Sequence, residues 1–237
     1  MQIKKKLEYP SWKIPFFFIK SIIIFIKIVR TGILKLLIEN KYFNKQIELI
    51  LKILNFVFGN NNQEQIGKKL SNVLMNLGPG YIKFGQALST RPDILGKETC
   101  DELSILQGKL KPFSNSIAKK IIQAENENLL QESLSSFNEN PIASASIAQV
   151  YAGILKNGQK VAIKILKPNI HKELFRDFTF FYWTTKFFEF CIPSIKRLKL
   201  SKNVEVLSEV SLNELDLTLE ASAADELAEN FKDHHNY

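Results

Sequence analysis

The sequence predicts an α+β fold, in which a small antiparallel sheet lies among helices. Two observations lead to this prediction. Apolar residues repeat with the period of an α-helix through most of the chain, whereas the stretch from Pro141 to Pro168 holds two short β-rich runs. Asn157-Gly158 joins the two runs and is the strongest short-range signal of a β-hairpin, for which we expect a type I′ turn. The expected helices are 66–77, 81–90, 97–108, 116–134, 172–190 and 203–233.

The net charge of +8 lies entirely in the first quarter of the chain. Residues 1–58 hold 11 Lys and Arg and 3 Glu, while the remaining residues hold 21 charges of each sign. A nucleic-acid-binding protein usually spreads a basic face over its folded body, so we expect no nucleic-acid partner. Cys100 and Cys191 are far apart, and the three histidines have no ligand neighbours at metal spacing. We therefore expect a reducing compartment, no disulfide framework and no metal site.

The segment 14–38 is rich in apolar residues but carries Lys20, Lys27, Arg30 and Lys35. At about 100° per residue, these four cations fall within a sector of about 140°. A membrane span needs roughly 20 apolar residues with few charges, so the pattern favours a helix that lies on an anionic membrane surface. Packing of this helix on the protein's own core, or against a partner protein, stays open. The apolar side would hold Phe18, Ile22, Phe25, Ile26, Val29 and Ile33.

Two later helices have unusual compositions. The segment 172–190 has nine aromatic residues, which indicates either a well-buried helix or a contact with lipid or a partner. In the acidic segment 203–233, Asp216 and Glu220 are four residues apart and would share a helix face. Such a like-charge pair costs roughly 0.2–0.5 kcal/mol, so we expect a basic group opposite it.

A loop and a strand carry the pattern of a phosphate-binding site. Residues 143–150 read Ala-x-Ala-x-x-Ala-x-Val, the glycine-rich pattern GxGxxGxV of protein kinases with alanine at each glycine position. Val161-Ala-Ile-Lys164 follows on the second run of the hairpin, where a kinase places the lysine that holds the α/β-phosphates. Glu220, on a downstream helix, is the type of acid with which such a lysine pairs. The three parts occur in the kinase order, which indicates a nucleotide site.

Two further motifs complete a resemblance to a known family. Lys83-Phe-Gly85-Gln86 resembles the KxGQ signature of the UbiB/aarF atypical kinase-like family. Glu214-Leu-Asp216 resembles the ExD motif of that family, and the alanine-rich segment 141–150 resembles its nucleotide loop. Order and spacing match across residues 65 to 233, and the bacterial UbiB branch, which is linked to ubiquinone biosynthesis, fits best.

The resemblance implies a role for each matching residue. Lys164 would bind the α/β-phosphates and pair with Glu220. The catalytic residues would be Lys83, Gln86, Glu214 and Asp216. Lys83 and Gln86 would lie over the nucleotide site, and the two acids would meet their helix from the opposite side, with Lys83 paired to one of them. The nucleotide-binding residues would be Ala143, Ala145 and Ala148 of the phosphate-covering loop, Val150 against the adenine, Lys164 and Glu220.

The resemblance does not extend over the catalytic half of the family. Catalysis of this type needs an Asp that orients the nucleophile, and an Asp and an Asn that hold Mg²⁺. No HRD-like or DFG-like segment occurs in the 237 residues. We therefore expect an N-terminal piece of the family's chain, with the metal ligands in an absent C-terminal lobe. Its parts would be a membrane-surface arm (1–58), a helical KxGQ region (64–138) and a kinase-like N-lobe (139–237).

The function implied by the resemblance is that of an atypical kinase-like ATPase that uses ATP or ADP with Mg²⁺ and supports ubiquinone biosynthesis. The expected partners are an anionic membrane surface and an isoprenoid quinone lipid or its biosynthetic enzymes. The expected location is peripheral, on the cytoplasmic face of the inner membrane. Two other hypotheses stay open: a non-catalytic module that binds lipid or a partner, and a structural role in which Lys164 forms a buried salt bridge.

Overall fold

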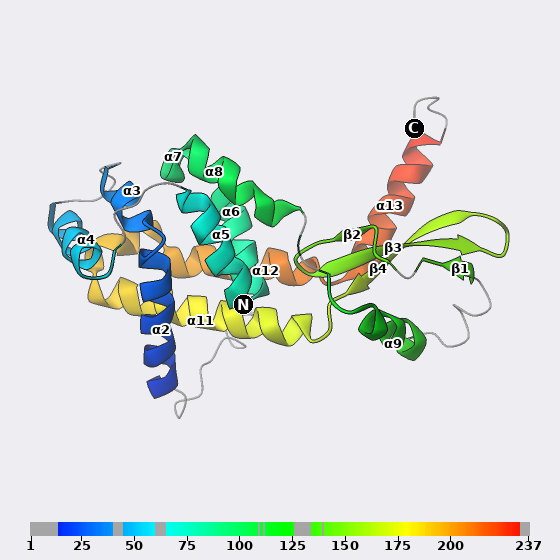
Figure 1. Ribbon diagram of the computed structural model, residues 1–237, viewed down its shortest axis with the longest axis horizontal. Coiled ribbons are helices and arrows are strands. Elements are labelled where there is room, and N and C mark those ends of the chain that lie inside the picture. The colour runs from blue at the N-terminus through cyan, green and yellow to red at the C-terminus, as the bar shows by residue number, and fades with distance from the viewer. Residues whose placement is uncertain are drawn as a thin grey trace. The chain divides into compact units, whose positions relative to one another are not determined.

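The computed structural model describes residues 14–39, 45–59, 65–108, 110, 112–125, 134–138 and 140–232 (Figure 1). These residues divide into two compact units. The first unit holds the described residues up to Glu173, and the second holds those from Leu174 onward. Each unit is described by itself.

Helices form most of the first unit. Its core includes Leu74, Tyr81, Leu103 and Leu106, which are all buried, where α5 packs against α6 and α8. The helices are α2 (Ile14–Val29), α3 (Ile33–Glu39), α4 (Lys45–Phe58), α5 (Ile66–Leu77), α6 (Pro79–Ser89), α7 (Pro92–Leu95), α8 (Lys97–Leu103), the 3₁₀ helix η2 (Ser104–Gln107) and α9 (Asn115–Glu125).

The start of α5 depends on a distant side chain. Gln65, the residue before the helix, has a left-handed conformation (φ 59°) and provides no side-chain cap. Glu102 of α8 replaces that cap, since its Oε2 accepts a hydrogen bond from the Gly67 N–H at 2.8 Å. The bond satisfies one of the N–H groups that the first turn of a helix leaves unpaired.

The expectation of one continuous helix over 14–38 is wrong, because α2 and α3 are separated by a turn. The Thr31 hydroxyl donates to the Ile28 carbonyl at 2.6 Å, and Gly32 has a positive φ of 95°. Val29 and Ile33 of the expected apolar side are buried, at 0% and 7% exposure. Phe18 and Ile22 of that expected apolar side are exposed, at 43% and 58%.

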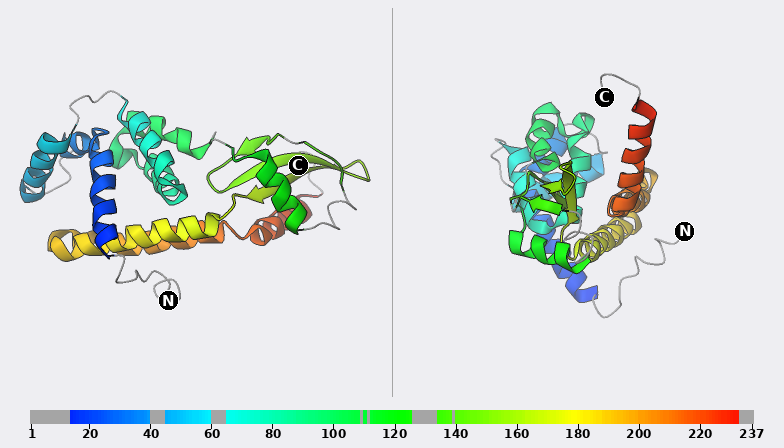
Figure 2. Two further views of the ribbon diagram at one scale, coloured as in Figure 1. Left: turned by 60° about the horizontal axis from the view of Figure 1, so that its bottom comes forward. Right: turned by 90° about the vertical axis from the view of Figure 1, so that its right-hand side faces the viewer.

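The sheet of the first unit is antiparallel throughout, and β3 is its central strand. Along one edge β3 pairs with β4, and along the other it pairs with β2 near its start and with β1 near its end. Tyr151 and Ile165 form a buried cluster with Ala118 of α9, which covers this face of the sheet (Figures 1 and 2). The α+β prediction is therefore confirmed. The strands are β1 (Leu134–Phe137), β2 (Ala143–Ser144), β3 (Ala148–Leu155) and β4 (Lys160–Leu166).

Strand β1 replaces the end of a predicted helix. We expected a helix over 116–134, but α9 is described to Glu125 and Leu134 begins a strand, while 126–133 lie outside the described residues. Leu134 is paired with Leu155, and Phe137 with Gly153 of β3. Pairing with a strand that lies 16 to 21 positions later in the sequence determines this conformation, so the local repeat did not reveal it.

The predicted hairpin between β3 and β4 is confirmed, but its turn is not of type I′. The Gly158 N–H donates to the Leu155 carbonyl at 2.9 Å, and the Leu155 N–H donates to the Gln159 carbonyl at 2.9 Å. Residues 156–158 therefore form the loop, and of these Gly158 alone has a positive φ, at 86°. This is a three-residue loop, in which a type I turn is followed by a left-handed glycine.

The second unit consists of helices. Tyr182 and Val204 form its buried cluster, with Phe175 and Phe181 packed against them. The aromatic helix is buried mainly in its first half, because Phe190 near its end is 81% exposed. The elements are α11 (Ile170–Cys191), which begins in the first unit, η3 (Pro193–Leu198), α12 (Leu200–Asn213) and α13 (Leu217–Phe231).

Helix α12 begins in the same way as α5. Lys199 precedes it in a left-handed conformation (φ 47°) without a side-chain cap. Glu189 of α11 replaces the cap, since it accepts hydrogen bonds at 2.9 Å from both the N–H and the hydroxyl of Ser201. The predicted helix over 203–233 is wrong as one element, because it ends at Asn213 and a new helix begins after Asp216.

Candidate functional site

Several of the residues that were predicted to bind the nucleotide lie on one face of the sheet. Lys164 of β4 lies directly opposite Val150 of β3, and the next pair on this face is Ala152 with Ala162. Successive side chains of a strand point to opposite faces, so these residues lie on the face opposite the one that α9 covers. The Lys164 side chain is half-buried. This face therefore combines an apolar floor with a half-buried cation at Lys164.

The alanine-rich segment forms a tight hairpin at the start of β3. Ala143 is paired with Val150, and the Ala145 N–H donates to the Ala148 carbonyl at 2.9 Å. By strand alternation, Ala143, Ala148 and Val150 lie on the face of Lys164. Ala143 and Ala145 are exposed, whereas Ala148 is buried. The structure thus brings together five of the predicted nucleotide residues: Ala143, Ala145, Ala148, Val150 and Lys164.

The tip of this hairpin is tied to the end of β4. The Lys167 N–H donates to the Ile147 carbonyl at 2.8 Å. Burial lowers the pKa of the Lys167 ammonium group, while the carboxylate of Glu173 acts in the opposite direction. A second, half-buried lysine therefore lies next to the hairpin, a residue that the motif reading did not include.

The KxGQ motif lies on α6, as predicted. Lys83 is half-buried. Gln86 donates a hydrogen bond from Nε2 to the backbone carbonyl of Leu106 in η2, at 2.7 Å. Gly85 lies close to both η2 and α5, since a Cβ on it would lie 2.4 Å from Leu106 Cδ1 and 2.7 Å from Leu74 Cδ1. Two of the three signature residues thus have a structural function in addition to any role at a nucleotide.

The acidic motif lies between two helices rather than inside one. Asp216 is the N-cap of α13, where its carboxylate accepts hydrogen bonds from the N–H of Thr218 at 3.0 Å and from the Thr218 hydroxyl. These bonds lower the pKa of Asp216. Glu220 lies in the first turn of α13, where the helix dipole favours a negative charge. The expected unfavourable pair on one helix face is therefore wrong. Glu214, at the C-terminal end of α12, is exposed.

The remaining pairings connect residues of different units and stay predictions. Lys83, Gln86 and Lys164 belong to the first unit, and Glu214, Asp216 and Glu220 belong to the second. Motif reading missed Gln149 of the alanine-rich segment, which is completely buried and hydrogen-bonded. Gln149 stands between Ala148 and Val150, and alternation along the strand places its side chain on the face opposite theirs. This position in the strand was the signal that the sequence offered. Within the described residues, no cluster of three or more His, Cys, Asp or Glu side chains is arranged to hold a metal ion.

A hairpin of small residues, followed by a strand whose lysine faces a valine, defines the N-lobe of a kinase-like fold. The sequence pattern of the family described as ABC1 atypical kinase-like domain matches residues 105–237. This match covers more than half of the chain, and the chain therefore belongs to the ABC1 (UbiB) atypical kinase-like family.

Similar curated proteins support this assignment. A protein named probable protein kinase UbiB from Shewanella baltica (strain OS185) is 40% identical over 168 residues, which are 70% of this chain and 31% of the relative. A protein of the same name from Shewanella sp. (strain MR-4) is 39% identical with the same coverage. The matched region thus spans about a third of the length of these relatives.

A solved structure is also similar in sequence. The erythromycin complex of Rv3197 from Mycobacterium tuberculosis is 29% identical, and the match covers 80% of this chain and 45% of that chain with a TM-score of 0.40. Among the described residues, no helix has both the length and the apolar character needed to cross a membrane.

Proposed function

We propose that this chain is the nucleotide-binding part of an atypical kinase-like ATPase of the UbiB branch, which supports ubiquinone biosynthesis at a membrane. The observation that carries the proposal is the position of Lys164 opposite Val150, on the sheet face that α9 leaves uncovered. Membership of the family and the names of the relatives point in the same direction. In this proposal the whole protein uses ATP or ADP with Mg²⁺, and its partners are a membrane surface and an isoprenoid quinone lipid or the enzymes that make it.

The residues of this face fit ATP or ADP. Val150 and Ala162 offer an apolar surface of the kind that an adenine ring contacts, and Lys164 offers a cation for the α/β-phosphates. The exposed Ala143 and Ala145 place backbone groups beside the same face. The Cβ of alanine keeps the backbone farther from a phosphate than glycine does, and alanine avoids positive φ. This loop would therefore hold the phosphates differently from the glycine-rich loop of a protein kinase. Bound Mg²⁺ would neutralise phosphate charge.

The acids of the second unit complete the proposal. Glu220 would pair with Lys164, and Lys83 with Glu214 or Asp216. The Asp216 carboxylate already accepts two hydrogen bonds from Thr218, so any contact with Lys83 has to use its remaining lone pairs.

Nucleotide binding can be measured by the thermal shift that Mg-ATP or Mg-ADP produces. A ligand at about 100 times its Kd stabilises the native state by about 2.7 kcal/mol, which is easily detected. We expect a clear shift for the wild type and little shift for Lys164→Ala. Lys160→Ala is the matched control, because Lys160 lies on the same strand and face but is exposed at the far end. Equal shifts for both variants would exclude Lys164 from the phosphate site.

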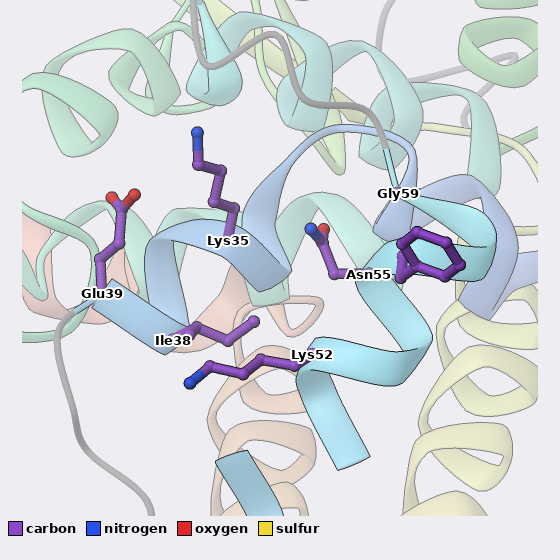
Figure 3. A pocket seen from close by; sticks show the side chains of 7 residues that line it. Lys35, Ile38, Glu39, Lys52, Asn55 and Gly59 are labelled. Atoms are coloured by element: carbon purple, nitrogen blue, oxygen red, sulfur yellow. The ribbon is translucent and has the colours of Figure 1, made fainter. Parts of the chain in front are cut away.

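A second candidate function, binding of a lipid surface without catalysis, is favoured by the side chains of α4. This helix exposes a stripe of apolar side chains that are 50–92% accessible: Leu49, Ile50, Ile53, Phe56 and Val57. Beside the stripe, α3 and α4 form the sides of an open pocket of about 460 Å³ that Lys35, Lys52 and Glu39 line together with Phe56 (Figure 3). Apolar side chains next to lysines are typical of helices that lie in a membrane interface. A peripheral position on the cytoplasmic face of the inner membrane is part of this proposal.

Flotation with vesicles separates the two functions. We expect the chain to float with phosphatidylcholine vesicles that contain phosphatidylglycerol, and less with phosphatidylcholine alone, because lysines near anionic lipid contribute about 1 kcal/mol each. Ile53→Ser should reduce flotation, whereas Ile105→Ser, at a similarly exposed isoleucine of η2 (50% against 55%), should not. Equal flotation of the two variants would exclude α4 as the membrane contact. Flotation without any nucleotide-dependent thermal shift would favour the non-catalytic function.

A further inference from the structure

The segment that connects the KxGQ helices to the sheet is hydrogen-bonded at both of its ends. We name residues 106–113 the strap; Lys109 and Lys111 within it lie outside the described residues. The strap begins at the end of η2, and the described residues 112 and 113 precede α9. All of it belongs to the first unit, as do α6 and the alanine-rich hairpin.

Two glutamines hold the helical end of the strap. Gln86 of α6 donates from Nε2 to the carbonyl of Leu106 at 2.7 Å, and Leu106 itself is completely buried. Gln107 Nε2 donates in the opposite direction, to the hydroxyl of Ser89 on α6, also at 2.7 Å. The start of the strap is thus fixed to the KxGQ helix by a hydrogen bond from each side.

The other end of the strap is bonded to the alanine-rich hairpin. The Leu110 N–H is shared between two acceptors, the Gly108 carbonyl at 2.9 Å and the Ser144 carbonyl of β2 at 3.3 Å. Gln149 of β3 donates from Nε2 to the Phe113 carbonyl at 3.4 Å, while its Oε1 accepts from the Tyr151 hydroxyl at 2.8 Å. Gln149 is completely buried, so its amide depends on these partners.

Both contacts meet the hairpin at a single cross-strand pair. Ser144 and Gln149 lie directly opposite each other, and the next pair along is Ala143 with Val150. Because neighbouring residues of a strand face opposite sides, the Gln149 side chain lies behind the hairpin, while Ala143 and Val150 lie at its front, on the face of Lys164. A change in the position of the strap therefore changes the position of the proposed nucleotide loop.

We propose that Gln86 and Gln149 are positioning residues, which hold the alanine-rich hairpin in place through the strap and thereby couple the KxGQ helix to nucleotide affinity. Gln86 then acts on the nucleotide through Leu106, Leu110 and the hairpin. The effect on nucleotide affinity rests on the proposed nucleotide site. The coupling between α6 and the hairpin does not, because its hydrogen bonds are present in the chain without nucleotide.

Hydrogen exchange of the full chain without nucleotide tests the coupling. Gln86→Met keeps the length of the side chain but removes the donor. We expect exchange at the amides of Leu110 and Ala145 to accelerate roughly five- to tenfold, the range for loss of one hydrogen bond. The amide of Gly158, at the far end of β3, should change by less than about twofold, because no strap contact reaches it. A uniform increase at all three amides would indicate general destabilisation and overturn the coupling.

Control variants test whether the effect passes from α6 through the strap to the hairpin. Thr90→Ala removes a hydroxyl bond within the same end of α6, from Thr90 to the Ala87 carbonyl, and should leave Leu110 and Ala145 unchanged. Gln149→Met should accelerate the same two amides as Gln86→Met, while Tyr151→Phe, which removes only the hydroxyl bond to Gln149, should have a smaller effect. If Gln86→Met does not fold, Gln107→Ala replaces it, because Gln107 is exposed and loosens the same end of the strap.

Titration with Mg-ADP then tests the functional consequence. We expect Gln86→Met and Gln149→Met to weaken binding roughly three- to tenfold, and Thr90→Ala to leave it unchanged. If the wild type does not bind Mg-ADP, the proposed function fails while the exchange data still decide the coupling. If the wild type binds and both glutamine variants keep its affinity and its exchange rates, the positioning role is overturned.

Discussion

Gly85 of the KxGQ motif lies so close to Leu106 that a Cβ on residue 85 would be 2.4 Å from Leu106 Cδ1. The same atom would lie 2.7 Å from Leu74 Cδ1 of α5. Both leucines are almost completely buried, so a shift of either side chain would disturb the packing of the core. The glycine of the motif is therefore required where α6 packs against α5 and η2.

Gly85→Ala should destabilise the chain by about 1–3 kcal/mol, the usual effect of forcing an extra methyl group into a packed core. Urea unfolding at neutral pH measures this change. Ala87→Ser, which adds one atom at an exposed position of the same helix, is the matched control. Equal stability of the two variants would contradict the close packing of α6.

Asp216 should stabilise α13 through its side-chain oxygen. Asp216→Ala is expected to reduce helical content and stability, because the N–H of Thr218 loses its acceptor, whereas Asp216→Asn should retain both, since Asn is an equally good N-cap. Circular dichroism during urea unfolding measures the two variants. If nucleotide binding is lost in Asp216→Asn while its stability is normal, the charge has a second role besides the cap.

Glu189 should make the stability of the second unit depend on pH. Burial acts to raise the pKa of its carboxyl group, but the hydrogen bonds from Ser201, together with Lys186, outweigh burial and lower the pKa below its ordinary value of 4.5. A lowered native pKa means that the stabilisation is complete above the ordinary pKa and is lost as the pH falls through the native pKa.

Glu189→Gln should therefore reduce the loss of stability between about pH 5 and pH 3. At pH 7 the variant should be less stable than the wild type by about 1 kcal/mol, the usual contribution of a helix cap. Glu209→Gln, at an exposed position of α12, is the control and should keep the pH profile of the wild type. Parallel profiles for the wild type and Glu189→Gln would contradict the capping role.

Gly158 should be sensitive to substitution for a different reason from Gly85. Its φ is 86°, and a Cβ on it would meet no atom within 4 Å, so backbone conformation alone determines the effect. Gly158→Ala should cost about 1 kcal/mol, whereas Gly158→Asn should cost less, because Asn tolerates the left-handed region. Chemical unfolding compares the two, and equal losses would contradict a purely conformational effect.

The sequence was most informative where structure depends on neighbouring residues. The alternation of Val161 to Leu166 correctly predicted a strand with Lys164 on the face opposite Ile163 and Ile165. The break before α13 was also present in the sequence, since Asp216 ahead of an apolar run with Glu220 in the first turn is an N-cap signal. We interpreted the two acids as a pair on one helix face instead, and this interpretation was wrong.

Contacts between distant residues could not be predicted from local patterns. Strand β1 reads Leu-Ser-Ser-Phe, which has little β-propensity, and it is a strand because β3 pairs with it. The bond from Gln86 to Leu106 spans 20 positions and that from Gln149 to Phe113 spans 36. Glutamine at either position has no periodicity or motif that would reveal its partner.

The two glutamate caps affect how the chain folds. Neither α5 nor α12 has a start signal of its own, so a short peptide that covers either helix should be largely unstructured in water. In the folded chain the first turn of each helix is capped by Glu102 or Glu189 from another helix. Secondary and tertiary structure should therefore form together at these two points, and partial unfolding that separates α8 from α5, or α11 from α12, should also unwind the capped end.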